Sequence, residues 1–249
     1  MSLVAIILTY NESHHIADCI ASLGWADSIL VFDSFSTDDT VKIATASGAA
    51  VIQHPFENYT TQRNAALAAV QDEWVFFVDA DERSSQEQAA EIRLKIEDSS
   101  VDGYWVPRHN YIFGKLTRHT GWYPDYQMRL LRRLKAHYDT SREVHELVIL
   151  EGQAAYLTAP LTHFNYRDLK QFVGKQERYT DHAARDLHAQ GIRVKPQNYV
   201  LQPVRHFIWR FITLHGYQDG FHGLRLSLLM AWYEFQKYVR LGSLWKKGK

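Results

Sequence analysis

Residues 73–83 read Glu-Trp-Val-Phe-Phe-Val-Asp-Ala-Asp-Glu-Arg. The unbroken apolar run from Trp74 to Val78 predicts a short strand buried on both faces, as in a parallel sheet. Three carboxylates follow at once, Asp79, Asp81 and Glu82, and they repel one another unless a cation lies between them. Mg²⁺ and Mn²⁺ are the expected cations, because they take oxygen ligands from one or two carboxylates together with substrate phosphates. The alternative is a solvated acidic turn that caps the next helix.

The segments around this stretch alternate between strand and helix patterns. Strands are predicted at residues 3–8, 28–32, 49–53 and 74–78, each followed by a helix. Asn11 or Ser13 is expected to cap the first helix, and Ser36-Thr37-Asp38-Asp39 forms a capping box for the second. Ser85 is expected to cap the fourth. This alternation predicts a doubly wound, mostly parallel α/β sheet.

Beyond residue 100 the alternation ends. The pattern predicts strands at 103–107 and 127–133, a hairpin joining 147–150 to 154–157, a helix over 168–190, and apolar segments at 204–217 and 221–241. We therefore expect a catalytic domain over residues 1–166 and a helical extension over residues 167–249.

The composition is that of a globular chain. Its 249 residues are 46% hydrophobic, enough for one large domain or one domain with an appendage. Cys19 is the single cysteine, which excludes an internal disulfide and is typical of a reducing compartment, so the cytoplasm is the expected location. The N-terminus lacks a signal-peptide pattern, and no apolar run reaches the roughly 18–20 residues of a spanning helix.

Acidic side chains are expected to meet at one edge of the sheet. The first strand ends at Thr9-Tyr10-Asn11-Glu12, the second at Asp33 and the fourth at Asp79-Ala80-Asp81, and the carboxyl ends of parallel strands share an edge. The chain has no Gly-x-Gly-x-x-Gly, phosphate-loop or Gly-x-Ser-x-Gly motif, which weighs against dinucleotide-binding proteins, P-loop enzymes and serine hydrolases. Carboxylates and an aromatic side chain without a glycine loop suit a nucleoside diphosphate held through a metal.

Four motifs in this order resemble glycosyltransferase family 2, whose members have the GT-A fold. They are Thr9-Tyr10-Asn11-Glu12, Asp33-Ser34-Phe35-Ser36-Thr37-Asp38, Gln62-Arg63-Asn64 and Asp79-Ala80-Asp81. Later segments resemble a branch that includes lipopolysaccharide inner-core glucosyltransferases: residues 121–125, 129–133, 144–146, 163–166 and 219–224. The resemblance covers most of the chain.

The resemblance implies where a nucleotide-sugar donor binds. Thr9, Tyr10 and Glu12 would line the pocket for the base and the ribose. Asp33 would accept a hydrogen bond from a uracil ring, and Arg63 would lie near the base or the diphosphate.

The resemblance also implies a metal site. Asp79 would approach the ribose and the metal, and Asp81 would ligate the Mg²⁺ or Mn²⁺ that bridges the phosphates of the donor. A metal there would neutralise the charge that the nucleoside diphosphate gains as the anomeric bond breaks. His163 is either a further metal ligand or a histidine satisfied in the core.

An inverting transfer needs a general base beneath the acceptor hydroxyl. The Glu-Asp pair that many members carry after the metal motif is missing from that region of this sequence. Glu146, in Val-His-Glu, occupies the corresponding place in the order of elements, and Asp125, in Trp-Tyr-Pro-Asp, is the other candidate. The alternative role of Glu146 is an ion pair with one of the neighbouring arginines.

Four arginines are concentrated in one part of the chain: Arg129, Arg132, Arg133 and Arg142. Guanidinium groups bind phosphate in a bidentate manner, so these side chains are candidates for holding the donor diphosphate or a phosphorylated acceptor. The alternative is that they neutralise the acidic cleft.

Charge is divided unevenly along the chain. Residues 1–192 carry 18 basic and 26 acidic side chains, whereas residues 193–249 carry 10 and 2. Two apolar stripes with helical spacing, beginning at Val204 and Phe221, lie in the basic part. This pattern is typical of helices on an anionic membrane surface. The alternative is packing against the catalytic domain or against a second subunit of a homo-oligomer.

The sequence thus predicts an α/β GT-A domain with a helical extension. The expected activity is metal-dependent, inverting transfer of a hexose from a UDP-sugar, with glucose as the first candidate sugar. The expected acceptor is a lipopolysaccharide core or another surface glycan or glycolipid. No nucleic-acid partner is expected, and the location is the cytoplasm or the cytoplasmic face of the inner membrane. One alternative is a polyprenyl-phosphate glycosyltransferase, which often carries spanning helices. The other is a non-catalytic binding or scaffold protein, which would be expected to have lost an acidic position.

Overall fold

The computed structural model of the chain describes residues 1–140 and 148–247, in two compact units. The first unit contains Met1–Arg108 and Asp125–His163, and the second contains His109–Pro124 and Phe164–Lys249. Residues 109–124 thus belong to the same unit as the C-terminal helices. The reason is local bonding within the second unit, where Thr120 donates its backbone N–H to Leu214 and accepts from Arg210.

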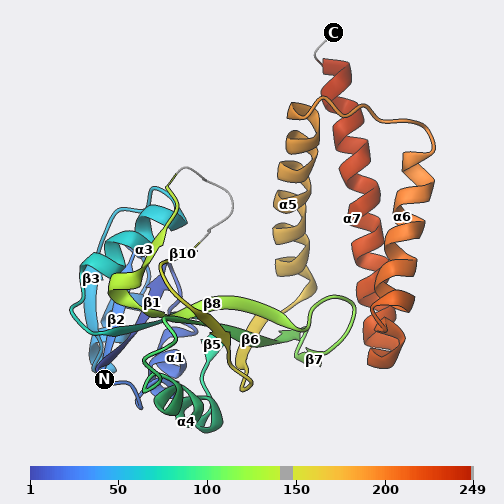
Figure 1. The fold of residues 1–249 in the computed structure, drawn as a ribbon. Helices are drawn as coiled ribbons and strands as arrows, with labels where there is room; N and C mark the ends of the chain where they lie inside the picture. The colour runs from blue at the N-terminus through green and yellow to red at the C-terminus, as the bar shows by residue number, and fades with distance from the viewer. Residues whose placement is uncertain (141–147, 248–249) are drawn as a thin grey trace. The chain divides into compact units, whose positions relative to one another are not determined.

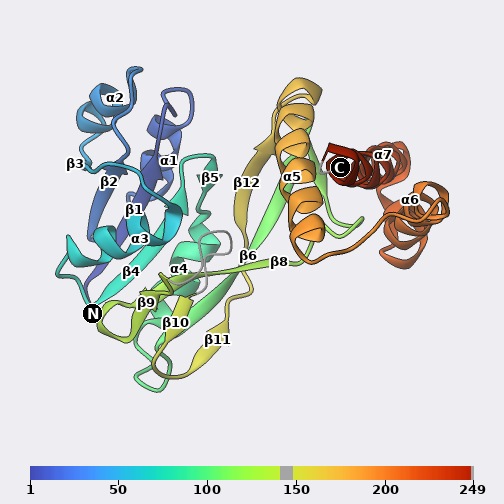
Figure 2. The ribbon, with the colours of Figure 1, turned by 90° about the horizontal axis from the view of Figure 1, so that it is seen from above.

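The first unit is built on parallel strands in the order β3-β2-β1-β4 (Figures 1 and 2). These strands are β1 (Leu3–Thr9), β2 (Ser28–Asp33), β3 (Ala50–Gln53) and β4 (Trp74–Asp79). All four confirm the predicted strands. In register, Thr9 lies beside Asp33 and Leu8 lies beside Asp79, so the carboxyl ends of β1, β2 and β4 share one edge.

Four helices follow these strands: α1 (Ile16–Ser22), α2 (Thr40–Ala46), α3 (Tyr59–Ala68) and α4 (Gln86–Lys95). Ser85 caps α4 by accepting from the backbone N–H of Gln88, as predicted. The predicted caps of α1 and α2 are wrong, because neither helix has a side-chain cap. Their polar residues instead join two loops, since Asn11 accepts from the backbone N–H of Thr37.

The sheet continues in strands that are mainly antiparallel. They are β5 (Glu82–Arg83), β6 (Gly103–Ile112), β7 (Lys115–Thr117), β8 (Asp125–Arg132), β11 (Ala154–Tyr156) and β12 (Leu161–Tyr166). β8 lies between β4 and β6 and is antiparallel to both, which confirms the predicted antiparallel strand. The predicted hairpin is wrong. β10 (Val148–Leu150) pairs with β9 (Ala136–Tyr138), which follows the short 3₁₀ helix Arg133–Lys135, and β11 pairs with β6.

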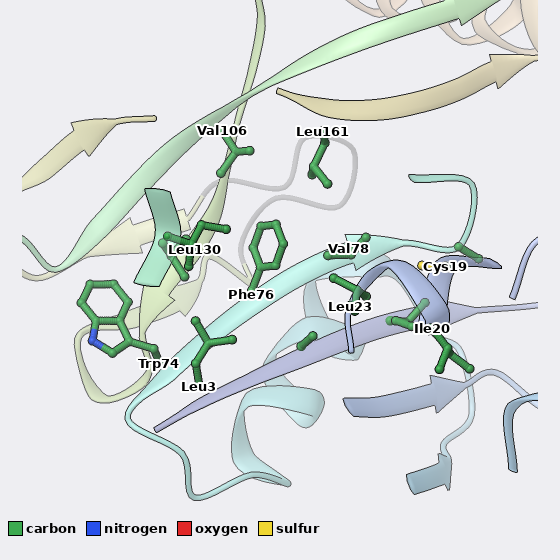
Figure 3. Packing of buried hydrophobic residues seen from close by; sticks show 14 of the residues in the cluster. Leu3, Cys19, Ile20, Leu23, Trp74, Phe76, Val78, Val106, Leu130 and Leu161 are labelled. Carbon is green, nitrogen blue, oxygen red and sulfur yellow. The ribbon is translucent and has the colours of Figure 1, made fainter. Parts of the chain in front are cut away.

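β4 is buried on both faces, as its apolar run predicts. Trp74, Phe76 and Val78 pack with residues of β1, α1 and α4 on one face (Figure 3). Val75 and Phe77 pack with residues of α3 on the other face. Each buried side chain of this size stabilises the fold by about 1.5–3 kcal/mol. The strand that ends in the acidic cluster is therefore firmly held at the centre of the core.

The second unit contains α5 (Leu169–Ala189), α6 (Asn198–Ile208) and α7 (Gly220–Lys247). A π-helical segment (Trp209–Thr213) and a 3₁₀ helix (Gly216–Asp219) join α6 to α7. Asp168 caps α5 through the backbone N–H of Gln171, and this helix confirms the predicted one. The core of the unit includes Phe172 and Leu226. Among the described residues, no helix combines the length and the apolar character that crossing a bilayer requires.

Candidate functional site

Asp33 is fully buried where β2 ends. Its Oδ1 accepts from the hydroxyls of Thr9 and Ser36, and its Oδ2 accepts from the backbone N–H of Ser36 and from Gln53 Nε2. A carboxylate has about four acceptor positions, so these donors fill them. A base that bonds to Asp33 would have to replace one of them, and Ser36 and Gln53 are the donors from outside the strand pair.

The loop after β1 leaves an aromatic side chain open to solvent. Asn11 adopts φ 57°, and its side-chain oxygen accepts from the backbone N–H of Thr37. The backbone N–H of Glu12 donates to Thr40 Oγ1 at 2.8 Å. These bonds fix the loop, while the ring of Tyr10 is 59% exposed. The roles of Tyr10 and Glu12 in a base pocket remain predictions.

Arg63 extends from α3 to the end of β4. Its guanidinium is buried and lies over the rings of Phe77 and Tyr138, with its central carbon 5.0 and 5.6 Å from the ring centroids. Its Nη2 is 3.6 Å from Asp79 Oδ1. The aromatic rings and the carboxylate together hold the positive charge beside the acidic cluster.

Asp79 is bound by a second arginine. Nη1 and Nη2 of Arg129, on β8, donate to Oδ1 and Oδ2 of Asp79 at 3.0 and 2.5 Å. Burial alone would raise the pKa of Asp79, but the charges of Arg129 and Arg63 outweigh it, so this pKa lies below its usual range. Asp79 is therefore ionised and oriented by the protein itself, and a metal-binding role for it remains a prediction.

Glu82, the third carboxylate of the acidic run, connects Asp79 to β6 and β8. It is fully buried, and its Oε2 accepts from the backbone N–H of Asp79 at 2.9 Å. Its Oε1 lies 3.2 Å from Arg108 Nη1 and 3.6 Å from Arg129 Nη2. The sequence signal was its place in the acidic run, but its two partners come from β6 and β8, far along the chain.

Asp125, one of the two candidate bases, is bound by the same Arg108. Nε and Nη2 of Arg108 donate to Asp125 Oδ2 at 3.0 and 2.6 Å. Asp125 Oδ1 accepts from Gln127 Nε2. The carboxylate is therefore tied to a guanidinium that also binds Glu82. The other candidate, Glu146, lies outside the described residues, as does Arg142.

Asp81 and His163 come together from distant parts of the chain. Glu82 and His163 are partners in the antiparallel pairing of β5 with β12. This pairing leaves Asp81 Oδ2 3.5 Å from His163 Nε2, and both side chains are largely buried. A carboxylate oxygen and an imidazole nitrogen at this distance suit a divalent cation. Over residues 1–140 and 148–247, no three acidic, His or Cys side chains are grouped to hold a metal alone. Asp81 and His163 together fit a cation whose remaining ligand positions are taken by substrate phosphates.

Two of the four clustered arginines lie away from this site. Arg132 pairs with Glu73 and Asp102, and its guanidinium lies 4.8 Å from the ring centroid of Trp74, at the amino end of β4. Arg133 donates to the backbone oxygen of Asp72. Neither is placed to hold a diphosphate at the carboxyl edge. Arg129 is at that edge and neutralises the acidic cluster.

The model for glycosyl transferase family 2 matches residues 4–148. The chain belongs to this family. Membership, together with the mixed sheet whose first four strands are parallel, confirms the predicted GT-A fold and the predicted glycosyltransferase activity.

Relatives of this family 2 glycosyltransferase cover nearly its whole length. It is 28% identical to an uncharacterized glycosyltransferase of Rickettsia prowazekii, over 98% of this chain and 87% of the relative. It is 27% identical to the lipopolysaccharide core biosynthesis glycosyltransferase LpsC of Rhizobium meliloti, over 94% and 90%. Among solved structures, glucosyl-3-phosphoglycerate synthase of Mycobacterium tuberculosis, in complex with Mn²⁺, UDP and glucosyl-3-phosphoglycerate, is similar with a TM-score of 0.48. The two sequences are 19% identical, over 78% of this chain and 81% of the synthase chain.

Proposed function

We propose that the protein transfers a hexose from a UDP-sugar to a lipopolysaccharide core or a related surface glycan, with glucose as the first candidate sugar. The transfer inverts the anomeric carbon and requires Mg²⁺ or Mn²⁺. The observation that carries the proposal is the pairing of Asp81 with His163 at the edge where Asp33 and Asp79 also lie. The likeness to LpsC supports the acceptor class. The proposed place of action is the cytoplasmic face of the inner membrane.

Each residue of the site is assigned a separate part in binding the donor. Tyr10 stacks on the base, and Asp33 accepts a hydrogen bond from it after Ser36 or Gln53 moves away. Arg63 and Arg129 hold Asp79 in one orientation towards the ribose. Asp81 and His163 would hold the metal, which when bound offsets the charge of the departing nucleoside diphosphate.

The acceptor hydroxyl must lose its proton to a base as it attacks the anomeric carbon. A carboxylate held by a guanidinium is a weaker base, because the positive charge favours its ionised form. The Asp125 carboxylate is occupied by Arg108 and Gln127. This arrangement supports Glu146 as the general base, with Asp125 and Arg108 holding β6 and β8 together beside the site.

The test is binding and donor hydrolysis with the full-length protein. Isothermal titration with UDP should show affinity that depends on Mn²⁺ or Mg²⁺, and a hydrolysis screen across nucleotide sugars should favour UDP-glucose. His163→Ala should weaken the metal-dependent part of UDP binding at least tenfold, whereas His137→Ala, at an exposed position on β9, should not. Metal-independent UDP binding in the unmodified protein would contradict the proposed site.

The two alternatives predict different results. A non-catalytic scaffold would hydrolyse no nucleotide sugar at all. A polyprenyl-phosphate glycosyltransferase would transfer the sugar to a polyprenyl phosphate in preference to a lipopolysaccharide core acceptor.

A further inference from the structure

One face of α6 and of the π-helical turn after it is apolar and open to solvent. We call this face the α6 stripe, and its residues are Val200, Leu201, Val204, Ile208 and Ile212. Each of these side chains is at least half exposed. Their spacing of three to four residues places them on one side of the helix. Exposed apolar patches of this kind mark interaction surfaces.

The opposite face of α6 provides the contacts that hold the helix in the second unit. Tyr199 packs against Phe235 of α7, with ring centroids 6.3 Å apart. Arg210, in the π-helical turn, donates to His206 and to the backbone oxygen of Thr120. α6 lies along α7 (Figure 1). The helix is therefore positioned without the α6 stripe, and the stripe is free to contact something else.

The chain segment that carries the α6 stripe has basic but no acidic side chains, and one acidic residue of α7, Glu234, lines a groove with Arg205. Between residues 193 and 213 the basic side chains are Arg193, Lys195, Arg205 and Arg210, and there is no Asp or Glu. Arg193, Lys195 and Arg205 are exposed. α7 has three apolar side chains of its own that are each about half exposed or more: Phe221, Leu228 and Trp232. An apolar stripe with basic neighbours is the pattern of a helix that lies in the headgroup region of a bilayer.

We propose that the α6 stripe docks the protein reversibly onto an anionic lipid bilayer, with Arg193, Lys195 and Arg205 contacting the lipid phosphates. A second copy of the chain is the less favourable occupant, because a two-fold contact would bring the same positive charges against each other. The choice of a bilayer rests in part on the proposed function, since docking would bring the enzyme to the surface that carries a lipid-anchored acceptor.

The test is co-sedimentation of the full-length protein with vesicles. The protein should sediment with vesicles of phosphatidylcholine and phosphatidylglycerol at low salt but not with phosphatidylcholine alone. Binding should weaken towards 1 M salt, where the Debye length falls from about 10 Å to about 3 Å. A basic residue near an anionic leaflet strengthens binding about fivefold. Replacing Arg193, Lys195 and Arg205 by Glu together should weaken binding roughly 100-fold or more.

Two matched pairs of variants separate the stripe from general effects. Serine at Leu201, Val204 and Ile208 together should also weaken binding to the vesicles strongly, whereas Leu94→Ser, at an exposed leucine of α4, should not. Lys42→Glu, exposed on α2, is the control for charge. Donor hydrolysis should be unchanged in all of them, so loss of docking is distinguishable from failure of the proposed function.

Three results would overturn the proposal. The first is no sedimentation at low salt. The second is sedimentation that the serine and glutamate variants leave unchanged. The third is a stable dimer in light scattering that the serine variant converts to a monomer, which would identify the α6 stripe as a contact between copies of the chain.

Discussion

Asp79 and Asp81 are two residues apart, yet the structure predicts different effects when each is replaced by asparagine. Asp79 receives both terminal nitrogens of Arg129, whose side chain is 6% exposed. Removing one member of a buried ion pair costs about 3–5 kcal/mol. Because the Asp79 side chain is 34% exposed, water and the nearby Glu82 reduce this to about 2–3 kcal/mol. At about 2–4 °C per kcal/mol, Asp79→Asn should lower Tm by roughly 4–12 °C.

Asp81 should behave differently. It has one contact with His163, at 3.5 Å, whereas Asp79 receives two hydrogen bonds from Arg129. A normal hydrogen bond contributes about 0.5–1.5 kcal/mol net, so losing a contact this long costs about 1 kcal/mol or less. Asp81→Asn should therefore change Tm by less than about 4 °C but remove the metal dependence of UDP binding, because the amide is neutral.

The assay is thermal denaturation followed by circular dichroism, with isothermal titration of UDP with and without Mn²⁺ for the same samples. Asp39→Asn is the control, since Asp39 is exposed and its ion pair with Lys42 spans 4.0 Å. The reasoning is refuted if Asp79→Asn melts within about 1 °C of the unmodified protein, or if Asp81→Asn melts as low as Asp79→Asn.

Three further predictions concern the base, the pH dependence and the second unit. Glu146→Gln should lower the transfer rate roughly 10²–10⁴-fold with little change in donor affinity, and an active Glu146→Gln beside an inactive Asp125→Asn in the same kinetic assay would reverse the assignment. The pKa of Asp79 is lowered on folding, so its ion pair stabilises the fold fully above the unfolded value of about 3.9 and less as the pH falls below it. Melting curves of the unmodified protein and Asp79→Asn should accordingly converge below about pH 4, and a constant gap would count against the ion pair. Gly223→Ala should destabilise the second unit by about 1–3 kcal/mol in urea denaturation, because the new methyl carbon would lie 1.9 Å from the backbone oxygen of Gly216. An unchanged midpoint would show that the two glycines can separate.

Features that depend on neighbouring residues were predictable from the sequence. The apolar run of β4 identifies a strand buried on both faces, because its alternate residues fill two different packed layers. Ser85 caps α4 as expected, because an N-cap bonds only three residues ahead. The caps of α1 and α2 were wrong for the opposite reason. Asn11 and Asp38 bond across two loops that only the pairing of β1 with β2 brings together.

The sequence by itself determined the family, the parallel strands and the acidic residues at their carboxyl ends, because apolar runs, turn residues and motif spacing are properties of short segments. Only the tertiary structure decided which side chain each of those acidic residues contacts. β8 lies beside β4 and supplies Arg129 to Asp79, whereas β12 lies beside β5 and supplies His163 to Asp81. Arg108 reaches Glu82 and Asp125 in the same way. These partners are up to about 80 residues apart in the chain, and a charge in a buried cluster takes its role from whichever side chain the packing places within about 4 Å of it.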